Sequence, residues 1–283
     1  MCDLVRRHSL VPKPCYRRQI GHPGKPTTRI AAPNAVWTAD FTGPLKTGDG
    51  LYCSPLTVAD GSSRVLLGCQ ALSSTRVQEA KPVFVRLCKD FGVPTRLRTD
   101  NGVPFAPNTL ARWSQLSAWW VRRGILPAFI APGQPQPNGR HERRHRTLNV
   151  DTTRPPAKPR RAQQYTCDPC RQEFHCARPH EALDRPPPAS RSASSPRQLP
   201  DKRPPREDPD RFEVRDVSAN GGIRWNRPLV TVSICCAGEY GGLEELDEGV
   251  CNVSFGPLTR GRLLERQRRI EEASGRLNRR RCL

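Results

Sequence analysis

The segment AVWTADF at residues 35–41 decides the fold of this chain and singles out one carboxylate. Its alternating apolar side chains predict a β-strand over residues 36–41. An ionised side chain inside an otherwise apolar strand costs free energy unless it is paired or bound to a cation. We therefore expect Asp40 to have a partner from another part of the chain.

Two further strands are expected downstream, over residues 51–59 and 63–69, because the same alternation recurs there between glycine-containing turns. The pattern then changes to helical spacing and predicts a helix over residues 74–91. Ser74 would cap this helix at its start, and Gly92 would end it. A helix therefore follows three hairpin-connected strands.

Strands and helices alternate over the next part of the chain. We expect a strand at 95–99, a helix at 109–123 ended by Gly124, a strand at 128–130, a Pro- and Gly-rich loop at 132–139, and a helix at 138–150. These elements predict an α/β domain in which flanking helices cover a mixed five-stranded sheet. Their order resembles that of the ribonuclease H-like fold.

The flanking regions differ in composition from this core. Residues 1–32 read as a basic arm, the core with a trailing helix extends over 33–183, and 184–210 form a Pro-rich linker expected to stay extended. Short strands separated by turn signals predict a small all-β barrel at 211–265. Residues 266–283 form an arginine-rich tail that would be helical or disordered.

The charge balance points to a polyanionic partner. The chain has 47 Lys and Arg against 27 Asp and Glu, a formal net charge of +20 and a pI near 10.2. Such a surface favours nucleic acid, because binding releases the counterions of the phosphate backbone. The basic residues do not line an apolar helix, no apolar stretch is long enough to span a membrane, and no signal segment is recognisable. We therefore expect a cytoplasmic protein.

The 12 cysteines do not indicate a disulfide scaffold in a chain of this kind. Cys167, Cys170 and Cys176 with His175 have one zinc-like spacing, but the second half of a zinc ribbon is missing nearby. We interpret them as helix cysteines. A zinc-binding module is the least favoured alternative.

Three carboxylates stand where a fold of this kind would bring them together. Asp40 lies in the first strand, Asp100 at the exit of the strand at 95–99, and Glu142 in the first turns of the helix after the mobile loop. Each alone has a simpler reading, as an edge-strand residue, a tight turn or a solvated helix start. Together they supply the hard oxygen ligands that two Mg²⁺ ions require.

The sequences around these carboxylates resemble those of a known superfamily. The blocks WTADF (37–41), TDNG (99–102) and QPNGRHER (136–143) are similar to the three signature blocks of DDE-type transposases and retroviral integrases. Asp100 follows Asp40 by 60 positions, and Glu142 follows Asp100 by 42. The segment RPHEAL (178–183) is similar to the sequence that follows the core in bacterial insertion-sequence transposases.

The resemblance implies a polynucleotidyl transferase that cuts and rejoins DNA. Asp40, Asp100 and Glu142 would be the catalytic residues and would hold two Mg²⁺ or Mn²⁺ ions. The partners would be the element ends, a target duplex and further copies of the chain, and the setting a bacterial nucleoid. The resemblance also implies that the β-rich C-terminal region is an SH3-like barrel.

Several basic and polar residues are expected to contact DNA. His145, Arg146 and Asn149 would share a helix face with Glu142, since residues three, four and seven apart line up. The other expected contacts are Asn138 and Gly139 in the loop, Arg140, Arg143 and Arg144 as phosphate contacts, and Arg224 and Arg227 in the β-rich region.

Some features depart from the family pattern. Pro137 stands where the family usually has a polar residue, and it removes a backbone donor beside Asn138. No counterpart of the N-terminal helix-turn-helix region is recognisable, and Cys235, Cys236 and Cys251 occupy expected strand positions. A truncated, catalytically impaired DNA-binding remnant is therefore the alternative hypothesis, and a nuclease that only hydrolyses is another.

Overall fold

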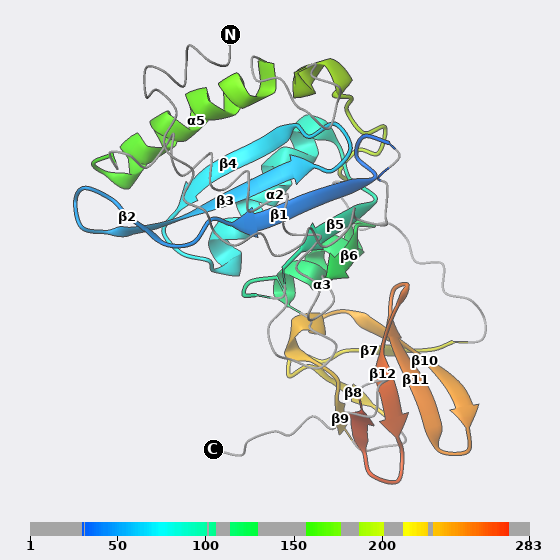
Figure 1. Ribbon diagram of the computed structural model, residues 1–283. Helices are drawn as coiled ribbons and strands as arrows, with labels where there is room; N and C mark the ends of the chain where they lie inside the picture. Colours follow the sequence, from blue (N-terminus) through cyan, green and yellow to red (C-terminus); the bar gives the residue numbers. More distant parts are fainter. Residues whose placement is uncertain are drawn as a thin grey trace, which may run out of the picture.

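The computed structural model describes residue 30 and residues 32–100, 102–105, 114–129, 157–176, 187–200, 212–225 and 229–271. These residues form an α/β domain followed by a β domain (Figure 1). The expected helix at 138–150 and the residues on both sides of it lie outside the described part of the chain.

The sheet of the α/β domain is mixed, as predicted. β1 (Val36–Phe41) pairs antiparallel with β3 (Tyr52–Asp60), which pairs antiparallel with β4 (Leu66–Leu72). On its other side β1 runs parallel to β5 (Arg96–Thr99), and β5 runs parallel to β6 (Leu126–Phe129). The parallel strands therefore deliver their carboxyl ends to one edge of the sheet.

Within the described residues the sheet has six strands rather than the predicted five. The additional strand is β2 (Leu45–Lys46), which pairs antiparallel with the start of β3, ahead of the part of β3 that pairs with β1. Two residues are too few to show an alternating pattern, so this strand could not be recognised from the sequence.

Helices cover both faces of the sheet (Figure 1). α2 (Val77–Phe91) and α3 (Gln115–Arg122) share the main hydrophobic core with Leu67 of β4. α5 (Arg160–Cys176) packs on the opposite face, against the neighbouring Leu66. None of the helices in the described ranges has the length and hydrophobicity needed to cross a membrane.

The ends of α2 correct one prediction and agree with another. Arg76 is the N-cap residue and makes no side-chain capping bond, so the expected cap at Ser74 is wrong. Ser74 instead donates its hydroxyl to Oε1 of Glu79 at 2.8 Å, while Oε2 of Glu79 accepts the backbone N–H of Ser73 at 2.7 Å. Gly92 ends the helix as expected, with a φ of +77°.

Two of the three cysteines of α5 are packing residues. Cys167 and Cys170 are buried against Cys69 of β4, whereas Cys176 is exposed. Nearby, the amide of Gln164 donates to the backbone oxygen of Cys69 at 3.0 Å and accepts the N–H of Ala71 at 2.8 Å. α5 therefore binds the outer edge of β4, where backbone groups would otherwise have no ladder partner.

The Pro-rich linker at 184–210 had been expected to stay extended, but its described part, residues 187–200, is not extended throughout. Pro188–Arg191 forms a 3₁₀ helix, and the following residues dock on the α/β domain. Ser195 is buried. It donates its N–H to Phe91 O at 2.8 Å and its hydroxyl to Val93 O at 2.7 Å. Arg197 donates to Gly124 O at 2.6 Å. We call residues 187–200 the strap.

The β domain consists of an antiparallel sheet and a small ribbon. The sheet has the order β13 (Arg269–Glu271), β12 (Leu258–Leu264), β11 (Val250–Phe255), β10 (Tyr240–Asp247) and β7 (Glu213–Asp216). The ribbon pairs β8 (Gly222–Arg224) with β9 (Leu229–Thr231) and contacts the sheet at β7 and β13. Closure into an SH3-like barrel remains a prediction.

Two expectations for this domain require correction. Residues 269–271, assigned to a helical or disordered tail, form β13, because Ile270 is buried in the domain core and its strand pairs with β12. Cys235 and Cys236 lie in a 3₁₀ helix, η4 (Ile234–Cys236), not in a strand, while Cys251 does lie in β11. The buried Cys236 packs into the core without belonging to a ladder.

Candidate active site

Two of the three expected carboxylates directly follow residues that are paired between β1 and β5. In the parallel pairing of β1 with β5, Thr38 is opposite Arg98 and Ala39 is opposite Thr99. Asp40 follows Ala39 within β1, and Asp100 follows Thr99 directly after the end of β5. Neighbouring strands lie about 4.8 Å apart, and partners in register present their side chains on the same face. The fold thus brings together two residues that the sequence separates widely.

Asp40 is held in place by the strand on its other side. It is 9% exposed, and β3 places Thr57 directly opposite it. The hydroxyl of Thr57, fully buried, donates to the backbone oxygen of Asp40 at 3.1 Å. β1 is therefore fixed on both sides at the position that carries this carboxylate.

Asp100 has a raised pKa and a buried carboxylate oxygen. Burial raises its pKa above the ordinary value, and the backbone N–H of Gly102, which donates to the carboxylate, offsets only part of that effect. Its Oδ1 atom is buried and has no hydrogen-bond partner among the residues that the structure describes. A buried carboxylate oxygen without a donor is costly unless something outside the polypeptide satisfies it.

Asp60 is a buried carboxylate whose hydrogen bonds are all made within the protein. It is 2% exposed, and both of its oxygens are satisfied. Oδ1 accepts the N–H of Asn34 at 2.9 Å, and Oδ2 accepts the N–H and the hydroxyl of Ser63, each at 2.7 Å. Among the carboxylates of the described residues, Asp100 is the one with a buried oxygen that accepts no hydrogen bond.

Aromatic side chains fix both carboxylate-bearing segments from below. Phe41 follows Asp40 directly, Phe105 lies in the turn after Asp100, and their ring centroids are 5.6 Å apart. Phe105 is fully buried and stacks on Trp120 of α3 at 6.0 Å. No sequence pattern predicted the position of Phe105, because a single aromatic residue in a turn shows no periodicity. It anchors the loop that carries Asp100.

The two carboxylates fit a hard divalent cation such as Mg²⁺. Carboxylate oxygens are the ligands this ion prefers, and Oδ1 of Asp100 is available to it. In the described ranges, no group of three or more His, Cys, Asp or Glu side chains converges. Glu142, the third expected ligand, lies outside those ranges, so the complete trio stays a prediction.

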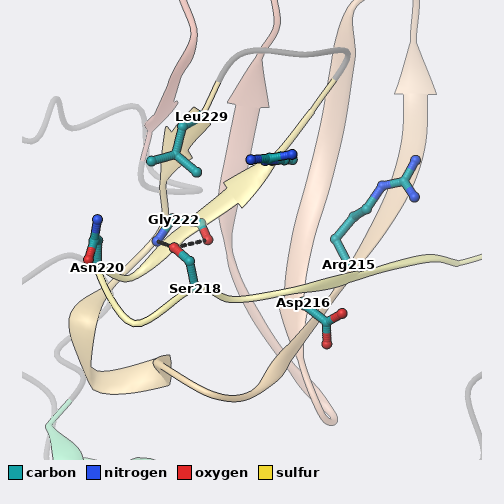
Figure 2. A pocket seen from close by; sticks show the side chains of 7 residues that line it. Arg215, Asp216, Ser218, Asn220, Gly222 and Leu229 are labelled. Carbon is teal, nitrogen blue, oxygen red and sulfur yellow. Dashed lines mark hydrogen bonds between the residues drawn. The ribbon is translucent and has the colours of Figure 1, made fainter.

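Most of the expected DNA contacts also lie outside the described residues. These are Asn138, Gly139, Arg140, Arg143, Arg144, His145, Arg146, Asn149 and Arg227. Arg224 is described and is exposed on β8. It lines a pocket of about 480 Å³, together with Arg215, Asp216, Ser218, Asn220, Gly222 and Leu229 (Figure 2).

The pocket is framed by the turn between β7 and β8. The hydroxyl of Ser218 donates to Gly222 O at 2.9 Å and accepts the N–H of Gly222 at 3.2 Å, which fixes the turn (Figure 2). The guanidinium of Arg215 forms an ion pair with Glu213 and lies 5.9 Å from the ring centroid of Trp225. The pocket thus presents arginine and amide donors on an ordered wall.

Two family models match this chain, and both are described as an integrase core domain. One matches residues 31–135, which include Asp40 and Asp100. The other matches residues 123–188, which include Glu142. Together the two matches extend over residues 31–188, more than half of the 283 residues.

Solved structures show a similar fold at low sequence identity. A chain of the simian T-cell lymphotropic virus intasome, in complex with PP2A regulatory subunit B56 gamma, is 14% identical with a TM-score of 0.50, and the match covers 86% of this chain and 84% of that one. The HTLV-2 integrase catalytic core domain, in complex with magnesium, is 13% identical with a TM-score of 0.45, over 58% of this chain and 99% of that one.

The BIV integrase catalytic core domain is 15% identical with a TM-score of 0.41, and the match covers 56% of this chain and 92% of that one. At these identities the likeness concerns the fold alone, and the intasome chain carries it. The expected α/β architecture, a mixed sheet with flanking helices, is confirmed.

Proposed function

Since this chain belongs to the DDE-type integrase and transposase superfamily, we propose that it is a transposase or integrase that cleaves DNA and joins the cut end to a target strand. Asp40, Asp100 and Glu142 would be its catalytic residues. The observation that carries the proposal is the buried Oδ1 of Asp100, which accepts no hydrogen bond from the described residues. Asp100 directly follows β5, the strand that pairs with the Asp40-bearing β1.

The chain's own residues would prepare the site before any metal binds. Asp40 and Asp100 would present their oxygens on one face of the sheet, each on a segment fixed by Phe41 or Phe105. Glu142 would complete the set from the helix at 138–150. Two bound Mg²⁺ ions would activate the attacking oxygen and stabilise the leaving oxygen of the phosphodiester.

The reaction would consist of two displacements at phosphorus. In the first, water attacks the phosphodiester at the end of the element, and the break leaves a 3′-hydroxyl. In the second, that hydroxyl attacks a target phosphodiester, so one bond forms as another breaks and no covalent enzyme intermediate is required. The site residues hold and orient the reacting groups, which is where most of the rate in such transfers arises.

DNA is the proposed partner because of the charge of the chain as well as its family. A formal charge of +20 gives a strong, salt-dependent attraction for a duplex. The basic residues around Glu142 and Arg224 would position the backbone, since phosphate contacts fix register without reading sequence. We also propose that the chain acts as a multimer, consistent with two DNA segments being joined in one event.

The test is a joining assay with the purified full chain. A labelled duplex carrying the sequences that flank this reading frame is incubated with a supercoiled plasmid and Mg²⁺ or Mn²⁺. We expect joined product from the parent protein and its loss in Asp40→Asn and Asp100→Asn. Asp90→Asn is the matched control, because Asp90 is an exposed carboxylate at the end of α2.

The other outcomes of the assay would each indicate a different activity or refute the residue assignment. Nicked plasmid without joined product would indicate a nuclease that only hydrolyses. Salt-sensitive DNA binding without either product would indicate the impaired remnant. Joined product that persists in both aspartate variants would refute the assignment of these residues.

A further inference from the structure

α3 has two buried faces, and only one of them belongs to the α/β domain. Leu116, Trp119 and Trp120 pack in the main core with α2 and the sheet. Ala118 and Val121, together with Arg122, lie three and four positions apart and therefore share another face of the helix. That second face is directed at the β domain, which lies next to α3 in Figure 1.

The contact between α3 and the β domain is a continuation of the β-domain core. Ala118 is fully buried and clusters with Ile223, Val253 and the other core residues of that domain. Val121 packs against the same cluster. A Cβ atom built on Gly256, in the turn between β11 and β12, would lie 3.0 Å from Cγ1 of Val121, so the turn approaches the helix closely.

An ion pair lies beside this apolar contact. Nε of Arg122 is 2.7 Å from Oε1 of Glu239, and the two side chains are 30% and 7% exposed. Arg122 Nε is buried and makes no aligned hydrogen bond, so the attraction is between charges. Partial burial lowers the pKa of Arg122 from its ordinary value.

Glu239 is itself rigidly held. Its backbone oxygen accepts the N–H of Val217 at 2.6 Å, and its N–H donates to Cys236 O at 3.0 Å. Both partners belong to the buried core of the β domain. The carboxylate that meets Arg122 is therefore fixed with respect to the whole β domain, and the pair can define an orientation.

We propose that α3 is shared by the two domains, and that Arg122 and Glu239 are positioning residues that hold the β domain in one place relative to Asp40 and Asp100. The same helix carries Trp120, which stacks on Phe105 under the Asp100 loop. The β-domain pocket and the carboxylates are thereby attached to opposite faces of one short helix. The activity part of this inference rests on the proposed function; the domain arrangement does not.

The arrangement is tested first without any DNA. Calorimetry of the full chain should give one unfolding transition, and small-angle X-ray scattering should fit one arrangement of the domains. Glu239→Gln leaves the partly buried Arg122 without the charge of Glu239, and Ala118→Glu places a charge in the shared core. Both substitutions should split the transition in two and increase the maximum dimension of the particle.

The control is an ion pair of the same kind outside the interface. Nη2 of Arg269 lies 2.9 Å from Oε1 of Glu271, with side chains 49% and 22% exposed. Substituting Glu271→Gln should leave a single transition and unchanged scattering, because exposed pairs contribute little. Arg122→Gln combined with Glu239→Gln should recover part of the loss, since it removes the uncompensated charge.

The activity readout separates positioning from folding. In Glu239→Gln, strand joining should fall about 10-fold or more, while the melting of the α/β domain, resolved as its own transition, stays near the parent value. Retained single-transition unfolding and parent-like scattering in both Glu239→Gln and Ala118→Glu would overturn the proposal. Absence of joining in the parent protein would count against the proposed function alone.

Discussion

Gly102→Ala is the substitution that tests most directly how the Asp100 carboxylate is held. A Cβ atom on Gly102 would lie 2.9 Å from Oδ2 of Asp100 and 3.5 Å from both Cγ and Oδ1. The φ of Gly102 is outside the left-handed region, so alanine can adopt this backbone without strain. The substitution should therefore act on the carboxylate and not on the fold.

The expected size follows from the crowding. Ordinary contacts begin near 3.4 Å, so the carboxylate must move by a few tenths of an ångström. A misplacement of 1 Å can cost about 100-fold in rate, so a shift of roughly half that size should cost about 10-fold, or about 1.4 kcal/mol in activation free energy. The free energy of unfolding should change by less than about 1 kcal/mol.

The assay is Mg²⁺-dependent joining of a labelled duplex end, with the Mg²⁺ dependence and the melting temperature measured on the same preparations. Gly241→Ala is the matched control, because the nearest atom to its Cβ is Ser254 O at 3.9 Å. A parent-like rate in Gly102→Ala would refute the reasoning that Gly102 sets the carboxylate. A rate loss accompanied by a large drop in melting temperature would show that the loop, and not the ligand geometry, had failed.

Three further outcomes are expected. Burial raises the pKa of Asp100, so the metal-free folded state binds this proton more tightly than the unfolded state does. The stability that this group contributes therefore falls as the pH rises from about 3.8, the unfolded value, through the raised folded pKa. Asp100→Asn should melt at a higher temperature than the parent at pH 7, the difference should shrink in acid, and Mg²⁺ should stabilise only the parent. Gly92→Ala should lower the free energy of unfolding, measured by urea denaturation, by about 2 to 4 kcal/mol. The reason is that Gly92 has a φ of +77° and an added Cβ would lie 2.5 Å from Ser195 O. A loss below about 1 kcal/mol would mean that the strap is not fixed at this point. Burial raises the pKa of Cys88 to about 12, so alkylation of the native protein at pH 8, followed by peptide mass spectrometry, should modify the exposed Cys176 and spare Cys88, whereas equal labelling would contradict the buried assignment.

Local sequence patterns were sufficient for the elements that form the centre of the fold. The alternation at residues 36–41 predicted β1 with its observed bounds, and helical spacing predicted α2 with the buried face that the structure shows. Gly92 and Gly124 end their helices as expected, each with a positive φ. These features follow from one residue's backbone preference or from a short periodic pattern, which act over a few residues.

Features that depend on distant partners were missed. The strap, β13 and the anchoring role of Phe105 arise from contacts between segments far apart in the chain, and none has a local signal strong enough to show them. Ala118 is the clearest case, because an alanine in a helix is compatible with an exposed or a buried position. Ala118 is buried because it packs against β-domain residues such as Ile223 and Val253, more than 100 positions later in the chain.

By itself, then, the sequence determined the central strands and helices of the α/β domain, the free-energy cost of an ionised Asp40 in an apolar strand, and the suitability of the chain for a polyanion. The tertiary structure alone decided that Asp40 and Asp100 directly follow the paired residues Ala39 and Thr99, that Oδ1 of Asp100 accepts no hydrogen bond from the described residues, and that α3 serves two cores. The physical reason is that periodicity reports which side of an element is buried, whereas the identity of what buries it is fixed only when non-local segments pack together.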